Sequence, residues 1–127
     1  VCMMKKEVLD YFLENNFKEI PNLIELLYES ILVLERYGKE FYIMICNDDS
    51  PEMDFKGLLR TIVPNDNNIY IVTNNELHLY LFVKAHIFRW VIQEYCSIPG
   101  VDKNITIHFQ TLRKLKEKGL KWETRSF

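Results

Sequence analysis

Hydrophobic positions along the chain follow two spacings, one typical of helices and the other of strands. In the first forty residues the spacing is three to four, which predicts an amphipathic helix over residues 4–14 and a second helix over residues 21–37. Pro21 suits a first helical turn, and Gly38 suits the position just beyond a helix C-terminus. The apolar face of the second helix is broad. We therefore expect it to be buried, either within the domain or in a homodimer.

Three short segments are predicted to be strands. Residues 41–46 (FYIMIC) form an unbroken apolar run that ends in turn residues, as in a strand covered on both faces. Residues 69–72 (IYIV) are the most β-prone stretch of the chain, and residues 105–109 (ITIHF) alternate in polarity. After the first strand we expect a helix over residues 50–63, with Phe55, Leu58 and Ile62 facing inward. After the third strand we expect a helix over residues 110–118, stopped by Gly119.

The segment between the last two strands is compatible with two folds. Residues 77–83 alternate between leucine or valine and larger or polar side chains, which is the spacing of a strand. Asn74 and Asn75 suit the positive φ values of a type I′ turn. A hairpin over residues 69–83 would therefore add a fourth strand and give a mixed sheet.

A single long helix explains the same segment better. Thr73 and Glu76 have the spacing of a capping box, and leucine is a good helix former. If a strand ended near Val83, the following helix would begin without a cap or a turn residue. We therefore expect one helix over residues 75–96.

Together these elements predict a small α/β domain covering residues 1–127. About three strands are separated by helices, with an N-terminal helix pair, and right-handed crossovers would make the strands parallel. The alternative is an α+β fold with the hairpin at residues 69–83 in a mixed sheet. A chain of 127 residues with 48% hydrophobic residues is sufficient for one packed core.

Cysteine use and hydropathy indicate the compartment. The three cysteines are odd in number and have no C-x-x-C spacing, which favours a reducing cytoplasm over a disulfide framework or a zinc ribbon. Lys84, Arg89 and Glu94 interrupt the most apolar segment, and no signal-like run follows Lys5 and Lys6. We expect a cytoplasmic protein without a membrane segment.

Polar residues follow each predicted strand, and parallel strands would bring them to one edge of the sheet: residues 47–50, 73–75 and 110–111. Four carboxylates near the first of these ends are candidate ligands for Mg²⁺: Asp48, Asp49, Glu52 and Asp54. Such a site would suit a metal-dependent nuclease or phosphohydrolase. However, helix N-caps require the same residue types, and no Asp-x-Lys or Glu-x-Lys follows a strand. Apart from that Mg²⁺, no cofactor is expected.

The histidines do not predict a metal site on the expected helix. His78 and His86 are eight positions apart, a rise of about 12 Å, which is too far for one ion. His108 lies in a predicted strand, where a cross-strand contact is more typical than metal binding. Glycine-rich phosphate loops are absent from the sequence.

Charge differs between the two halves of the chain. Residues 1–64 have 7 Lys and Arg against 12 Asp and Glu, whereas residues 65–127 have 9 against 6, for a net charge of −2 overall. A cluster near the C-terminus is a candidate for phosphate contacts in a nucleic-acid complex: Arg113, Lys114, Lys116, Lys118 and Lys121. Basic residues near a helix C-terminus also complement the helix dipole.

The N-terminal half supplies a candidate surface for a protein partner. Its acidic residues lie on the two predicted N-terminal helices: Glu7, Asp10, Glu14, Glu25 and Glu29. Charged rims of this kind speed and select association. Because the sequence has no catalytic signature, we expect a small cytoplasmic protein-binding or regulatory domain, such as an inhibitor of the immunity or anti-defence kind. Nucleic-acid binding and Mg²⁺-dependent hydrolysis are the alternatives.

Overall fold

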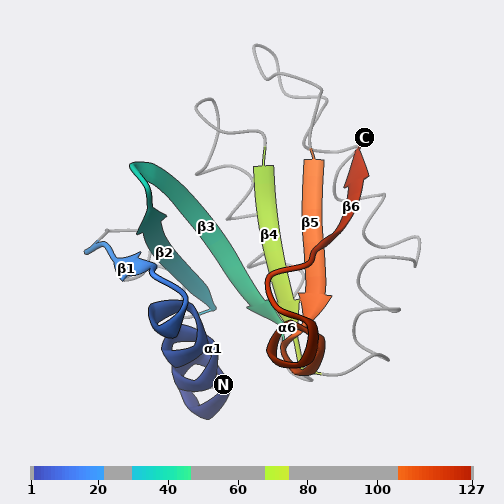
Figure 1. Cartoon of the computed structure of the whole chain (residues 1–127), viewed down its shortest axis with the longest axis horizontal. Helices are drawn as coiled ribbons and strands as arrows, with labels where there is room; N and C mark the ends of the chain where they lie inside the picture. Colours follow the sequence, from blue (N-terminus) through green and yellow to red (C-terminus); the bar gives the residue numbers. More distant parts are fainter. Residues whose placement is uncertain (1, 22–29, 47–67, 75–105, 127) are drawn as a thin grey trace.

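The computed structural model describes residues 2–21, 30–46, 68–74 and 106–126 (Figure 1). Within these ranges the chain forms two helices, α1 (Cys2–Glu14) and α6 (Leu112–Lys118). It also forms six strands: β1 (Lys18–Glu19), β2 (Ile31–Arg36), β3 (Lys39–Cys46), β4 (Asn68–Thr73), β5 (Thr106–Thr111) and β6 (Glu123–Ser126). None of the helices described is long and apolar enough to cross a membrane.

The strands form one mixed sheet in the order β1-β2-β3-β4-β5-β6. β2 is antiparallel to both of its neighbours, β1 and β3. β3, β4 and β5 are parallel, and β6 returns antiparallel to β5. The register places Cys46, Thr73 and Thr111 side by side. The carboxyl ends of the three parallel strands therefore meet at one edge of the sheet.

The predicted second helix is wrong for its C-terminal half, because Ile31–Arg36 is strand β2. Ile31, Leu32, Val33 and Leu34 are all fully buried, so both faces of β2 are covered. A strand buried on both faces has no polar alternation, and its continuous apolar run also fits a helical face. The argument for a homodimer through an apolar helix therefore no longer holds for these residues. Residues 22–29 lie outside the described part of the chain.

Tyr37 and Gly38 form the turn between β2 and β3. Both have positive φ, 53° and 77°, as the central residues of a type I′ turn require. Arg36 and Lys39 are directly opposite each other on either side of this turn. Gly38 is therefore a hairpin residue and does not end a helix.

Helices α1 and α6 cover one face of the sheet, which we call the helical face (Figure 1). Its core joins the two helices to alternate residues of the strands: Val8, Tyr11, Phe12, Phe17, Leu32, Leu34, Ile43, Ile45, Tyr70, Val72, Leu112 and Leu115. The other face is also buried, through Ile31, Val33, Met44, Ile69, Ile71, Ile107 and Phe109. This explains why β3 and β4 read as unbroken apolar runs.

The structure corrects the expected fold class. The described residues form a six-stranded mixed sheet with two short helices, not three strands separated by helices with an N-terminal helix pair. The alternative is right that the sheet is mixed, but its hairpin at residues 69–83 is wrong, because β4 already pairs with β3 on one side and β5 on the other. The expected helices at residues 50–63 and 75–96 lie outside the described residues.

Several predicted elements are confirmed. The first helix, the strands at residues 41–46 and 69–72, and the strand near residues 105–109 all form, and the last helix starts at Leu112 and is followed by Gly119. Beyond this helix, Glu123–Ser126 forms β6, which pairs with β5. Trp122 precedes that strand and stacks on Phe12, with ring centroids 6.1 Å apart. This contact ties the C-terminus to α1.

Candidate functional site

The exposed face of α1 carries Glu7, Asp10 and Glu14, which we call the acidic stripe. Spacings of three and four place the three side chains on one side of the helix, and all are exposed. Val8 and Phe12, on the other side, are completely buried. The buried side fixes α1 on the sheet, so the stripe is presented on a rigid support.

Two further features define the surface around the acidic stripe. Leu13 is 44% exposed and lies beside Asp10, three positions earlier on the helix. In the described part of the chain, no ion pair neutralises the stripe. Glu25 and Glu29, predicted to extend this surface, lie outside the described residues.

Helix α6 carries most of the predicted basic residues, which we call the basic segment: Arg113, Lys114, Lys116, Lys118 and Lys121. Leu112 and Leu115 anchor the helix in the core. All of the basic segment is exposed except Lys114, which is half-buried. The basic side chains therefore lie around the outside of a short, well-anchored helix.

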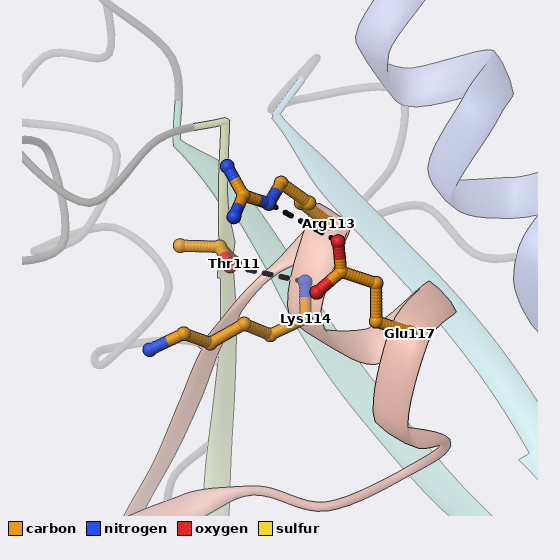
Figure 2. A network of polar contacts seen from close by, with 4 residues as sticks. All are labelled: Thr111, Arg113, Lys114 and Glu117. Carbon is orange, nitrogen blue, oxygen red and sulfur yellow. Dashed lines mark hydrogen bonds and ion pairs between the residues drawn. The ribbon is translucent and has the colours of Figure 1, made fainter.

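The start of α6 is fixed by Thr111, the last residue of β5. Its hydroxyl oxygen accepts a hydrogen bond from the backbone N–H of Lys114 at 3.2 Å, the geometry of an N-cap (Figure 2). Arg113 Nε donates to Glu117 Oε1 at 3.3 Å one turn later. Glu117, the single carboxylate of α6, is thereby engaged with Arg113.

A buried contact joins the two charged helices. The hydroxyl of Tyr11 donates a hydrogen bond to the backbone carbonyl oxygen of Leu115 at 2.7 Å. Burial raises the pKa of Tyr11 above its ordinary value of 10.0, because the apolar surroundings disfavour the phenolate. The acidic stripe and the basic segment therefore lie on neighbouring helices of one face.

The strand-end polar residues that the structure describes have structural partners. The prediction that the parallel strand ends meet at one edge is confirmed, with Thr73 next to Thr111. Gln110 accepts from the backbone N–H of Thr111 at 3.0 Å and donates to the carbonyl oxygen of Lys121 at 3.5 Å. Together with the cap at Thr111, these bonds explain why β5 ends in polar residues.

The predicted Mg²⁺ ligands, Asp48, Asp49, Glu52 and Asp54, all lie outside the described residues. Within the residues described, no group of three His, Cys, Asp or Glu is placed to hold a metal ion. That finding does not bear on the four carboxylates, so the metal site stays a prediction.

His108 makes the cross-strand contacts expected of it. Its Nε2 lies 2.9 Å from Asn68 Oδ1 on β4, and its Nδ1 lies 3.2 Å from Thr124 Oγ1 on β6. Its ring stacks on Tyr70, with centroids 4.5 Å apart. His108 therefore links three strands. His78 and His86 lie outside the described residues.

The sequence interpretation missed a third charged feature, at the β2–β3 turn. We call Arg36, Tyr37 and Lys39 the basic tip. The guanidinium of Arg36 lies 5.1 Å from the Phe17 ring centroid and 4.9 Å from that of Tyr37. Lys39 Nζ lies 5.2 Å from the ring centroid of Phe41. Tyr37 itself is 83% exposed.

A sequence signal for this turn was present. In "ILVLERYGKEFYIMIC" two apolar runs flank a short charged stretch that contains one glycine. That pattern is typical of a hairpin. Assigning Gly38 to the end of a helix hid the basic tip, because its residues come together only through the hairpin register.

Comparisons with family models, with curated proteins and with solved structures find no match to this chain.

Proposed function

We propose that this chain is a small cytoplasmic protein-binding domain whose acidic stripe contacts a basic surface of its partner. One observation supports this most directly: Glu7, Asp10 and Glu14 are exposed on a helix whose other side is completely buried. Charged residues of this kind accelerate encounter and select partners. The exposed Leu13 adds an apolar contact within the charged rim, as in the core of many interfaces.

A regulatory or inhibitory role follows from this mode of binding. The acidic stripe offers charge and shape on a rigid support, and binding through it requires no reaction from the chain itself. The domain would act by covering a basic surface that its partner needs. This is the manner in which an inhibitor of the immunity or anti-defence kind would work.

Affinity capture from the source cell tests the proposal. The full chain is immobilised and the retained proteins are identified and quantified by mass spectrometry. A stripe variant removes three negative charges: Glu7→Gln, Asp10→Asn and Glu14→Gln. A control variant removes three exposed carboxylates elsewhere: Glu19→Gln, Glu40→Gln and Glu123→Gln. Both variants change the net charge equally.

The wild type and the control variant should retain one partner in near-stoichiometric amount, and the stripe variant should lose it. Retention should also fall with added salt, because exposed charges are screened. Equal retention by all three proteins, or no stoichiometric partner at all, would contradict the proposal.

Nucleic-acid binding is the second candidate function, and one observation favours it. Lys116, Lys118 and Lys121 are exposed, while the carboxylate of Glu117 pairs with Arg113. Titration of labelled duplex DNA between about 50 mM and about 200 mM salt should then show a steep loss of affinity. Changing these three lysines to glutamine should reduce the salt slope by about 0.9 for each phosphate that is no longer neutralised. Absence of binding at low salt would remove this candidate.

A further inference from the structure

The large hydrophobic side chains that are exposed in the described part of the chain are Leu13 and Tyr37. Each lies within a charged patch, Leu13 beside the acidic stripe and Tyr37 in the basic tip. Each patch therefore combines one exposed apolar side chain with charged neighbours, and the charges of the two patches are opposite. Complementary charge around an apolar contact is what a specific interface requires.

The basic tip lies on the helical face. Leu34 and Phe41, two residues before Arg36 and two after Lys39, pack in the core beneath α1. Side chains of a strand alternate, so Arg36 and Lys39 share that face. Glu35 and Glu40, also opposite each other, fall on the other face of the hairpin. The hairpin thus separates its positive from its negative charges.

The cations of the basic tip make cation–π contacts within their own chain, but among the described residues they form no ion pair. Arg36 and Lys39 are directly opposite, where like charges repel. Arg36 Nε is buried and has no hydrogen-bond partner among the described residues. The same residues show no ion pair between the tip and the acidic stripe. Tyr37 combines 83% exposure with a positive φ of 53°, which aromatic residues rarely adopt. A carboxylate-bearing surface would offset the repulsion between Arg36 and Lys39, and an apolar contact would cover the exposed Tyr37 ring.

We propose that two copies of this chain associate, with the basic tip of each copy against the acidic stripe of the other. Arg36 and Lys39 face Asp10 and Glu14, and the Tyr37 ring packs on Leu13. This inference rests on the proposed function, because it uses the acidic stripe as a binding surface and names its partner as a second copy. In a two-fold dimer this contact is made twice, once by the tip of each copy.

Charge at the tip favours a protein surface over a nucleic-acid strand. A strand needs a positive groove that follows several successive phosphates. The tip offers two cations, and Glu35 and Glu40 on its other face repel a continuing backbone. Two carboxylates around one apolar side chain match its size and charge.

Sedimentation equilibrium of the full chain at low salt tests the proposal, with two charge-reversal variants. One reverses the stripe, Asp10→Lys with Glu14→Lys, and the other reverses the tip, Arg36→Glu with Lys39→Glu. The wild type should form a dimer whose dissociation constant rises with salt. Each variant alone should dissociate at least about tenfold more readily, because like charges then meet.

Mixing the two variants provides the decisive measurement. In a mixed dimer the reversed stripe meets the reversed tip, and the native stripe meets the native tip. The mixture should therefore dimerise as tightly as the wild type although neither component does. This recovery also shows that both variants are folded. Lys39→Glu with Asp10→Lys in the partner repeats the test without altering the partly buried Arg36.

A chain that stays monomeric at every concentration, or a mixture no tighter than its components, would overturn this inference. Reversal of Lys118 and Lys121 to glutamate is the control and should leave dimerisation unchanged. A monomer would not affect the capture of a different partner by the acidic stripe. Loss of that capture would likewise leave the dimer measurement standing, so the two proposals fail separately.

Discussion

The hydroxyl of Tyr11 and the backbone carbonyl oxygen of Leu115 are 2.7 Å apart, although 104 positions separate them in the chain. Tyr11 is 8% exposed, so the bond forms in the core between α1 and α6. Its aromatic ring also packs edge-to-face on Phe12, with centroids 5.4 Å apart. One side chain therefore fixes the position of one charged helix against the other.

Replacing Tyr11 with phenylalanine should lower the free energy of unfolding by about 1 kcal/mol, the usual net value of one hydrogen bond. The ring remains, so packing against Phe12 is preserved. Urea denaturation followed by circular dichroism measures the change, with Tyr37→Phe as the control because that hydroxyl is exposed. Equal stability of Tyr11→Phe and wild type would show that the bond contributes nothing.

The same residue predicts a pH dependence. Burial raises the pKa of Tyr11 above 10.0 in the folded state, so the folded state favours the protonated phenol. The stability that this provides is complete below the unfolded pKa of about 10 and is lost as pH rises through the folded pKa. The stability difference between wild type and Tyr11→Phe should thus shrink above about pH 10. A constant difference in urea titrations across this range would contradict the prediction.

Thr111 is both the last residue of β5 and the N-cap of α6. It is 2% exposed, and its hydroxyl oxygen caps the helix by accepting from Lys114 N–H. Thr111→Val keeps the shape and removes the cap, and should cost about 1 kcal/mol of unfolding free energy. Thr111→Ser keeps the hydroxyl and should cost less. Thermal and urea unfolding of the two variants compare them directly. A valine variant as stable as the serine variant would exclude a capping role.

How far the sequence predicts this fold depends on burial. α1 was predictable because Val8 and Phe12 are buried while Glu7, Asp10 and Glu14 are exposed, which gives a clear helical period. Strand β2, residues 31–36, was not predictable as a strand. Its burial on both faces removes the alternation of apolar and polar residues that identifies a strand. The mixed pairing of the sheet also depends on contacts distant in sequence, such as β4 with β5.

The same reasoning separates the predicted surfaces from the missed one. Glu7, Asp10 and Glu14 belong to one helix, so their common face follows from local spacing alone. Arg36 and Lys39 face each other only through the register of β2 with β3. A surface built by register becomes visible only after the turn at Tyr37 and Gly38 is assigned correctly.

Tyr37 gives the last prediction, because its backbone and its ring have opposite effects on stability. The φ of 53° is unfavourable for an aromatic residue but acceptable for asparagine, and Asn-Gly is the preferred pair in a type I′ turn. The ring offsets part of this cost through the guanidinium of Arg36, 4.9 Å from its centroid. Contacts of this kind contribute about 0.5 kcal/mol at exposed sites.

Tyr37→Asn should therefore raise the free energy of unfolding of the monomer by about 0.5 kcal/mol, since relief of the backbone exceeds the contribution of the ring. Tyr37→Ala removes the same ring without the tolerance of asparagine for positive φ, and should be less stable than Tyr37→Asn. Denaturation at concentrations where the chain is monomeric measures both variants. If alanine proves as stable as asparagine, the turn is not strained at Tyr37. A variant that gains stability while losing self-association would show that Tyr37 is retained for binding at the expense of the turn.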